Sequence, residues 1–300
     1  HAVRADAFGH DRRADRAHDL LQAYDTFGGI PRHVAALDVG AVGPGGELVS
    51  LAGTGEFYLL TEYAPGQTYA TDLRHVVATG KALAADVERA RALARYLVEL
   101  HRERRPDAAG YARALRDLVG HGEGIAGVVD NYGPDVPSAP PGRLQAIEAA
   151  CLRWRWRLRE RGGERLCRTH GDFHPFNILF GDDGSLALLD ASRGCAGDAA
   201  DDVTCLAINY LFFALEAPGS WAEGFRPLWR AFWDTYLGES RDRELLRAAS
   251  PFLAWRALVI GNPTFYPRLA PATRDRLLGL AERALAAEAF DPDWADEVAG

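Results

Sequence analysis

The chain has 300 residues, 48% of them hydrophobic, so it is long enough for one large domain or for two lobes with substantial cores. The formal net charge of −8 argues against nucleic acid as the main partner, because phosphate backbones are bound chiefly by basic residues. The longest apolar run, around residues 208–215, is interrupted by Asn209 and Tyr210 and is too short to cross a membrane, so we expect no membrane partner.

The four cysteines show no Cys-x-x-Cys spacing, and the chain begins with no recognisable secretory signal. Free thiols in such a pattern are typical of a reducing compartment. We therefore expect a cytoplasmic protein without a zinc site, and the sequence assigns no oligomeric state.

Residues 1–65 predict a small part of the chain that contains a helix and strands. Apolar side chains lie on one side of a helix over residues 11–27, and Gly28-Gly29 ends it. Strands are predicted at residues 34–42 and 47–51, joined by a Gly-Pro-Gly-Gly turn, and a third strand is predicted at residues 56–63.

Residues 66–300 predict a larger and mostly helical part. Helices are expected at residues 86–104, 143–161, 200–215, 221–236, 242–260 and 272–287. Residues 107–138 are rich in Gly and Pro and predict a mobile loop or short helices over a substrate site. The alternating Arg and Trp residues at 153–157 indicate packing with solvated arginines, because a helix spreads such side chains around its surface.

Three polar side chains surround a predicted hairpin at residues 169–190. Two short apolar runs flank a Gly-Asp-Asp-Gly turn, which is typical of a β-hairpin. Asp172 precedes the first strand, Asn177 opens it and Asp190 closes the second, so all three converge at one end of the hairpin. Each residue alone could be a turn or capping residue, but the ordered spacing of the set favours a functional site.

Phosphoryl transfer from a nucleotide requires this set of side chains. A carboxylate orients the acceptor hydroxyl and takes its proton, while an amide oxygen and a second carboxylate hold magnesium against the phosphates. Magnesium prefers hard oxygen ligands and keeps several waters, so two protein ligands suffice. We therefore assign the catalytic role to Asp172 and the metal-binding roles to Asn177 and Asp190.

The motif resembles the catalytic loop of protein kinases and, more closely, that of the aminoglycoside phosphotransferase and choline kinase-like family. That family has the pattern His-Gly-Asp, four residues, Asn, which is His170-Gly171-Asp172 followed by Asn177 in this chain. The resemblance extends over roughly residues 12–292 and is most specific between residues 169 and 202. It implies an α+β, two-lobed protein-kinase-like fold, with a small antiparallel-sheet lobe that is apparently truncated and a helical lobe.

The resemblance also implies roles for residues near the catalytic loop. His170 is a positioning residue at the catalytic site. The segment Gly197–Asp202 corresponds to a Gly-Asp-x-x-x-Asp segment that opens a helix. Asp202 best fits the family's structural aspartate, which accepts backbone donors and holds the catalytic loop, and Asp198 is expected nearer the substrate mouth.

A nucleotide site is implied at the connection between the lobes. The backbone of Glu62, Tyr63 and Ala64 would hydrogen-bond adenine, with Thr61 or Tyr63 shaping the pocket. Asp19 would be the acidic partner of the family's phosphate-contacting lysine. That lysine would lie near or before residue 1, unless Arg4 replaces it, and the absence of methionine predicts that residues precede position 1.

The sequence therefore predicts a kinase that uses ATP, or GTP, and Mg²⁺ to phosphorylate a hydroxyl of a small and possibly cationic molecule. An aminoglycoside or other amino sugar, with antibiotic resistance as the associated role, is the first candidate. Choline, homoserine or another sugar is the alternative, because motif residues report the reaction and not the acceptor. A rival interpretation is an inactive kinase-like protein that binds nucleotide or ligand. A protein kinase is disfavoured because no segment ending in Ala-Pro-Glu follows Asp190.

Overall fold

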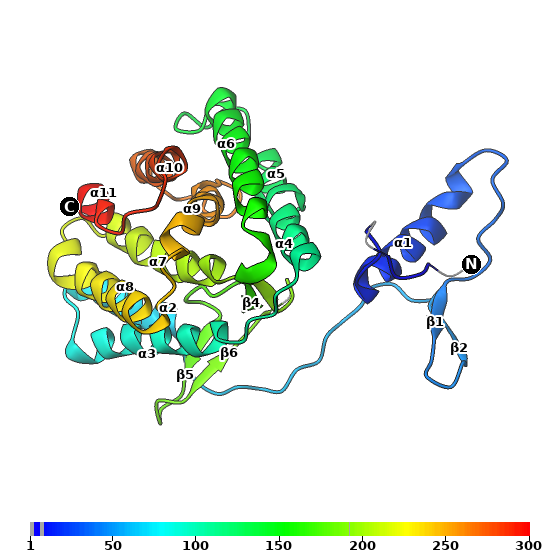
Figure 1. The fold of residues 1–300 in the computed structure, drawn as a ribbon, viewed down its shortest axis with the longest axis horizontal. Helices are drawn as coiled ribbons and strands as arrows, with labels where there is room; N and C mark the ends of the chain where they lie inside the picture. The colour runs from blue at the N-terminus through cyan, green and yellow to red at the C-terminus, as the bar shows by residue number, and fades with distance from the viewer. Residues whose placement is uncertain (1–2, 7–8, 192) are drawn as a thin grey trace. The chain divides into compact units, whose positions relative to one another are not determined.

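The computed structural model describes residues 3–6, 9–191 and 193–300 (Figure 1). The chain divides into two compact units, His1–Tyr63 and Ala64–Gly300, which are considered separately. In the part that the structure describes, no helix is both long enough and apolar enough to cross a membrane.

The first unit contains one helix and one hairpin. Helix α1 covers Arg13–Thr26 and is followed by a 3₁₀ turn, η1, at Phe27–Gly29. Strands β1 (Gly40–Val42) and β2 (Leu48–Ser50) pair antiparallel, with Gly40 opposite Ser50. The Gly-Pro-Gly-Gly segment turns the chain between them, because the Gly43 N–H donates to the Glu47 carbonyl over 2.8 Å.

The predicted third strand of this unit is wrong. Residues 56–63 have no regular secondary structure, and the strand predicted at 34–42 is reduced to β1. A strand exists only where a second strand satisfies its backbone hydrogen bonds, and none of the described residues pairs with residues 56–63. The apolar side chains of Tyr58 and Leu59 are accordingly exposed.

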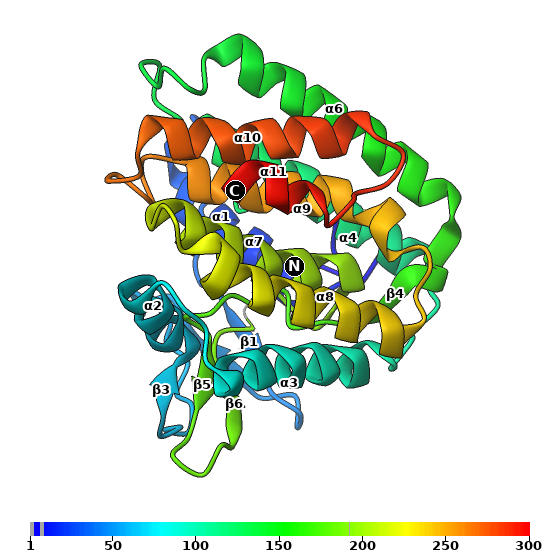
Figure 2. The same ribbon diagram turned by 90° about the vertical axis from the view of Figure 1, so that its left-hand side faces the viewer.

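The second unit is mostly helical (Figures 1 and 2). Its helices are α2 (Tyr69–Thr79), α3 (Ala84–His101), α4 (Ala108–Gly120), α5 (Ile125–Asp130), α6 (Pro141–Glu160), α7 (Ala199–Glu216), α8 (Arg226–Ser240), α9 (Leu245–Gly261), α10 (Pro271–Ala286) and α11 (Trp294–Ala299). Two short turns, η2 (Gly162–Arg165) and η3 (Trp221–Phe225), follow α6 and precede α8, respectively. The Gly- and Pro-rich region at 107–138 holds a longer helix than expected, because Tyr111, Leu115 and Leu118 of α4 form one buried face.

Helix α7 occupies the centre of this unit. Its side chains are buried along almost its whole length, as expected for a helix that is apolar on all sides. Figure 2 shows α7 between α9 and α10 on one side and α8 and α3 on the other, and α9, α8 and α3 all contact it. The first turn of α7 is therefore fixed from several directions.

Short antiparallel strands lie on one side of the helices. Strands β5 (Ile178–Phe180) and β6 (Leu186–Leu188) form a hairpin in which Ile178 lies opposite Leu188, and β3 (Gln67–Thr68) pairs with β5. Strand β4 (Leu166–Arg168) pairs with β7 (Ala196–Asp198). The β4–β7 pair places the segment that follows β4 next to the start of α7.

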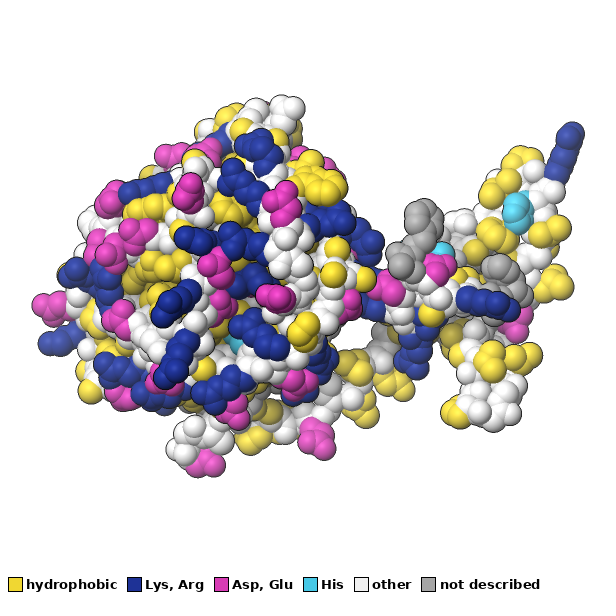
Figure 3. All heavy atoms as spheres, in the orientation of Figure 1, with side chains coloured by type: hydrophobic (Ala, Val, Ile, Leu, Met, Phe, Trp, Pro, Cys, Tyr) yellow, Lys and Arg dark blue, Asp and Glu magenta, His cyan; other side chains and the backbone are white. Residues whose placement is uncertain are grey.

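Charged side chains of both signs lie on the face of the larger unit that Figure 3 shows. On the face shown in Figure 3, Arg side chains alternate with Asp and Glu side chains.

A buried ion pair holds the start of α7. Asp198 caps the helix by accepting from the Ala200 N–H over 2.9 Å. Arg165 donates to both carboxylate oxygens of Asp198, each over 2.7 Å, and the Tyr111 hydroxyl donates over 2.8 Å. Burial alone would raise the pKa of Asp198, but Arg165 and these hydrogen bonds hold it below its ordinary value. The expectation that Asp198 lies near a substrate mouth is therefore wrong: it is buried and fully engaged in capping α7.

We expect Arg165→Met to lower the free energy of unfolding by about 3–5 kcal/mol, because it leaves the Asp198 carboxylate buried without its charge partner. Arg161→Met is the matched control, since Arg161 pairs with Glu244 at the surface and its loss should cost less than ~1 kcal/mol. Denaturant unfolding of both variants measures the difference. Equal costs would show that the Arg165–Asp198 pair does not stabilise the unit.

Candidate functional site

The loop that follows β4 is held by a single carboxylate from α7. Asp202 accepts from the N–H of His170 over 2.7 Å and from the N–H of Gly171 over 2.8 Å. Its side chain is completely buried, and it lies in the first turn of α7, where free backbone N–H groups favour negative charge. Two oxygens of one rigid residue therefore fix two successive peptide groups of the loop.

Asp202 is itself held from α3 and α8. The His101 Nε2 lies 3.1 Å from Asp202 Oδ2, and the His101 Nδ1 lies 2.7 Å from the Tyr236 hydroxyl. Burial opposes ionisation of Asp202, but the hydrogen bonds from His101, His170 and Gly171 hold its pKa below the ordinary value. The contact between His101 and Asp202 joins residues 101 positions apart and was not predicted from the sequence.

His170 and Gly171 shape the backbone that precedes Asp172. Gly171 has φ +84°, a left-handed conformation that residues with a side chain rarely adopt. The Asp172 N–H donates to His170 Nδ1 over 3.2 Å. The imidazole therefore stabilises the turn. Among the described residues, it makes no hydrogen bond to the Asp172 carboxylate, and this favours a positioning role over a catalytic one.

The Asp172 carboxylate is bound by two arginines. Its Oδ1 accepts from Arg256 Nη1 over 2.7 Å and from Arg193 Nη1 over 3.2 Å. Burial opposes ionisation, but Arg256, Arg193 and His174 together lower the pKa of Asp172. The side chain is about one-sixth exposed, with a relative accessibility of 16%. Asp172 is therefore an ionised carboxylate that is accessible from solvent.

Asn177 lies directly beside Asp172. Its Nδ2 donates to the Asp172 main-chain carbonyl over 3.1 Å and to Asp172 Oδ2 over 3.4 Å. Because the amide nitrogen faces Asp172, the amide oxygen is left for another partner. The structure brings Asn177 and Asp172 together as the motif predicted.

Asp190 follows the strand that pairs with the Asn177 segment. The Leu189 N–H donates to the Asn177 carbonyl over 2.9 Å, so the two strand ends lie side by side. Asp190 has φ +52°, and its exposed carboxylate makes no hydrogen bond with the described residues.

A free carboxylate and a free amide oxygen fit a magnesium ion that takes its other ligands from phosphates and water. The described residues contain no group of three or more His, Cys, Asp and Glu side chains that could hold a metal ion by themselves. The donor set of Asn177 and Asp190 therefore suits a metal that arrives with its substrate.

The expected nucleotide-binding residues lie apart from this loop in the sequence. Thr61, Glu62 and Tyr63 end the first unit and Ala64 begins the second, and none of them is in a helix or strand. Asp19 lies on α1, where its carboxylate contacts His10 and His18, each over 3.2 Å. The roles of these residues stay predictions.

Sequence reasoning missed four residues around Asp172: Arg193, Arg256, Trp255 and Glu123. Both guanidinium groups lie over the Trp255 ring, at 4.6 Å for Arg193 and 3.9 Å for Arg256. The Trp255 Nε1 donates to the Glu123 main-chain carbonyl over 3.1 Å, and Arg193 Nε donates to the Glu123 carboxylate over 3.2 Å. One signal was available for Arg256, because an arginine within the apolar run of α9 must be buried and therefore needs a charged partner.

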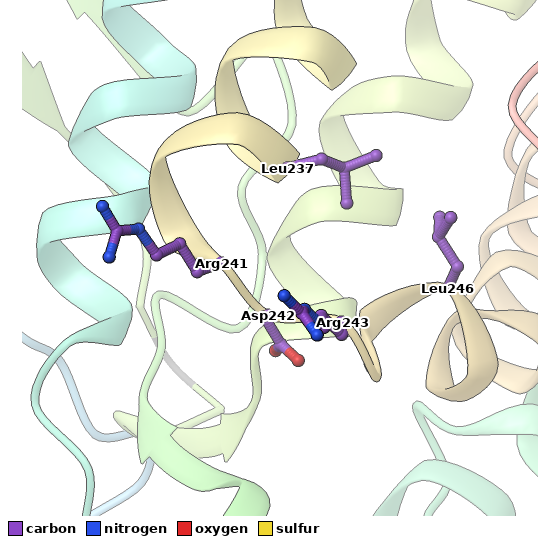
Figure 4. A pocket seen from close by; sticks show the side chains of 5 residues that line it. All are labelled: Leu237, Arg241, Asp242, Arg243 and Leu246. Atoms are coloured by element: carbon purple, nitrogen blue, oxygen red, sulfur yellow. The ribbon is translucent and has the colours of Figure 1, made fainter.

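A separate hollow of about 500 Å³ lies at the connection between the end of α8 and the start of α9 (Figure 4). It is lined by Leu237, Arg241, Asp242, Arg243 and Leu246. None of these residues is among those described above around Asp172, so the hollow does not extend the candidate site.

The model of the phosphotransferase enzyme family matches residues 3–249. This match confirms the resemblance that the His-Gly-Asp motif predicted, and with it the predicted α+β class of a kinase-like chain. No curated protein matches the sequence significantly.

Solved structures give weaker similarities. A glucosamine kinase is 19% identical, with a TM-score of 0.48, and the match covers 73% of this chain and 58% of the kinase. The same kinase in complex with glucosamine, ADP and inorganic phosphate gives a TM-score of 0.47 at 19% identity, again over 73% and 58%. An ethanolamine kinase of Plasmodium vivax is 12% identical, with a TM-score of 0.41, over 79% of this chain and 62% of that one. The chain thus spans less than two thirds of these proteins.

We expect Asp202→Asn to loosen the loop, because an amide has one acceptor oxygen and cannot bind both N–H groups as a carboxylate does. Hydrogen–deuterium exchange of a peptide covering residues 169–173 should become about tenfold faster or more, since hydrogen bonds to a charged group are worth roughly 1.5–3 kcal/mol. Asp182→Asn, at the exposed hairpin turn, is the control and should leave this exchange unchanged. Unchanged exchange in Asp202→Asn would contradict the role of Asp202.

Proposed function

The chain belongs to the phosphotransferase enzyme family, and we propose that it transfers the γ-phosphoryl group of ATP to a hydroxyl of a small molecule. The observation that carries this proposal is the adjacency of Asp172 to Asn177, next to the strand end that bears Asp190. An ionised carboxylate beside two oxygen donors is the arrangement that phosphoryl transfer requires.

Asp172 orients the acceptor hydroxyl and accepts its proton. Both arginines contact Oδ1, whereas Oδ2 receives a long contact from Asn177 and lies 3.6 Å from His174 Nε2. Oδ2, which has no arginine, is therefore the oxygen for the hydroxyl. A carboxylate whose pKa is lowered is a weak base. That weakness suits a loose transition state, in which the proton is transferred late and positioning contributes more than base strength.

Asn177 and Asp190 are the protein ligands of Mg²⁺ in this proposal. When bound with the nucleotide, the ion supplies positive charge that offsets the charge developing on the phosphoryl oxygens. Asn177 also donates to Asp172, so one side chain fixes the distance between the metal ligand and the catalytic carboxylate.

The remaining assignments extend the proposal to the rest of the chain. Thr61, Glu62, Tyr63 and Ala64 would hold adenine, or guanine if GTP is used. Asp19 would pair with a phosphate-contacting lysine. His170 and Asp202 would hold the loop, which agrees with their contacts to the backbone.

The acceptor is proposed as an aminoglycoside or other amino sugar, with choline, homoserine and simple sugars as alternatives. The first experiment is magnesium-dependent nucleotide consumption by the protein against a panel of these compounds, including glucosamine and ethanolamine. ATP and GTP are compared in the same assay. Turnover with one compound would identify the acceptor class. Tight nucleotide binding without turnover for any of them would favour a binding protein instead.

We expect Asp172→Ala to lower kcat by about 10²–10⁴-fold, because it removes the group that orients the hydroxyl and takes its proton. The affinity for the nucleotide should stay within about threefold, since Asp172 contacts neither the base nor the metal in this proposal. Asp182→Ala on the same hairpin is the control and should keep full activity. An Asp172→Ala enzyme with wild-type turnover would disprove the assignment.

We expect Asp190→Ala to weaken binding of the magnesium–nucleotide complex by about tenfold or more, because it removes a metal ligand. Calorimetric titration with nucleotide should show this loss in the presence of Mg²⁺. With EDTA in place of Mg²⁺, the variant and the unmodified protein should bind nucleotide equally. Equal affinities in both conditions would exclude Asp190 as a metal ligand.

A further inference from the structure

Arg256 is a buried arginine whose contacts all converge on the catalytic loop and the start of α7. It projects from α9 and is only 5% exposed. Its Nη1 donates to Asp172 Oδ1 over 2.7 Å, and its Nη2 donates to the Gly171 carbonyl over 2.9 Å and to Asp201 Oδ1 over 2.6 Å. The guanidinium therefore connects the catalytic carboxylate, the peptide group before it and α7.

The guanidinium group has little freedom to move. Asp201, in the first turn of α7, anchors Nη2, and the Trp255 ring lies 3.9 Å from the guanidinium carbon. Arg256 and Trp255 are successive residues of the same buried helix. A planar guanidinium that is fixed on two sides is a rigid donor for a carboxylate.

The geometry at Asp172 distinguishes the two carboxylate oxygens. Of the two arginines, Arg256 makes the shorter contact with Oδ1, over 2.7 Å, whereas Arg193 reaches the same oxygen over 3.2 Å and is a more exposed side chain. Oδ2 receives no arginine. Rotation of the carboxylate would break the contact with Arg256, so Arg256 determines which oxygen is available to an acceptor hydroxyl.

We propose that Arg256 is a positioning residue that fixes the Asp172 carboxylate with Oδ2 toward the acceptor. This inference rests on the proposed phosphotransferase function. A purely structural role would require only that Arg256 balance the charge of Asp201, whose side chain is 17% exposed. The contacts to Asp172 and to the Gly171 carbonyl are what a positioning role adds, and they predict a loss in turnover without a loss in binding.

The test compares steady-state kinetics of Arg256→Met with those of the unmodified protein, using the acceptor identified by the panel. We expect kcat to fall on the order of 10²-fold, which is the cost of misplacing a reacting group by about 1 Å. KM for the nucleotide and for the acceptor should stay within about threefold. Arg256→Lys should recover part of kcat, because an ammonium keeps the charge but cannot reach all three acceptors.

Two further variants separate positioning from folding. Arg274→Met removes another buried arginine, one that donates to the Gly261 carbonyl at the end of α9, and should keep kcat within about threefold. Arg256→Met combined with Asp201→Asn also removes the Asp201 charge that Arg256→Met leaves unbalanced, and the kcat of this double variant should stay low. Three results would each overturn the proposal. These are recovery of full kcat in the double variant, an equal loss of kcat in Arg274→Met, and a raised acceptor KM at unchanged kcat in Arg256→Met.

A second readout does not depend on turnover. In protein labelled with carbon-13 at aspartate carboxyl groups, the Asp172 signal is assigned by its absence from Asp172→Asn and recorded at pH 8. Arg256→Met should displace this signal and Arg274→Met should not. A displaced signal together with an unmodified protein that phosphorylates no acceptor would refute the proposed function alone, whereas an unchanged signal would refute the positioning role.

Discussion

The catalytic loop depends on one buried carboxylate. Asp202 binds the peptide groups of His170 and Gly171 from the first turn of a central helix, and His101 fixes it from α3. Backbone N–H groups in a buried loop must find acceptors, and this loop forms no sheet or helix that could supply them. Helix α7, which is packed on several sides, supplies these acceptors through the Asp202 side chain. The fixed position of α7 therefore also fixes the residue before Asp172.

Charge is arranged in pairs around that loop. Asp198 binds Arg165, and Asp172 and Asp201 share Arg256. The arginines hold the pKa of Asp198 and of Asp172 below its ordinary value, whereas burial raises the pKa of Asp201 to about 6. The Arg165–Asp198 pair and the Arg256–Asp172 pair differ in their access to solvent. The pair that caps α7 is fully buried, whereas Asp172 keeps a relative accessibility of 16% and one oxygen without an arginine. Similar ion pairs therefore cap a helix in one place and, in the proposed function, hold the catalytic carboxylate in the other.

Local patterns predicted much of the helical unit and the hairpin that brings the Asp172, Asn177 and Asp190 segments together, because helix periodicity and hairpin signals depend on neighbouring residues. The role of Asp202 in holding the loop was implied by the family resemblance. Contacts set by helix packing were not predictable in this way. Arg256 reaches Asp172 across 84 positions of sequence, and Asp198 turned inward because Arg165 meets it through the β4–β7 pair. The segment 56–63 has the composition of a strand but no partner strand among the described residues, and composition alone does not supply one.

Trp255 contacts Glu123 through the main-chain carbonyl and not through its carboxylate. Trp255 can keep this contact with any amino acid at position 123, whereas Arg193 would lose the carboxylate that now accepts its hydrogen bond. Glu123 itself is exposed beside Arg193. A substitution at position 123 therefore changes the charge beside Arg193 and leaves the main-chain contact of Trp255 in place.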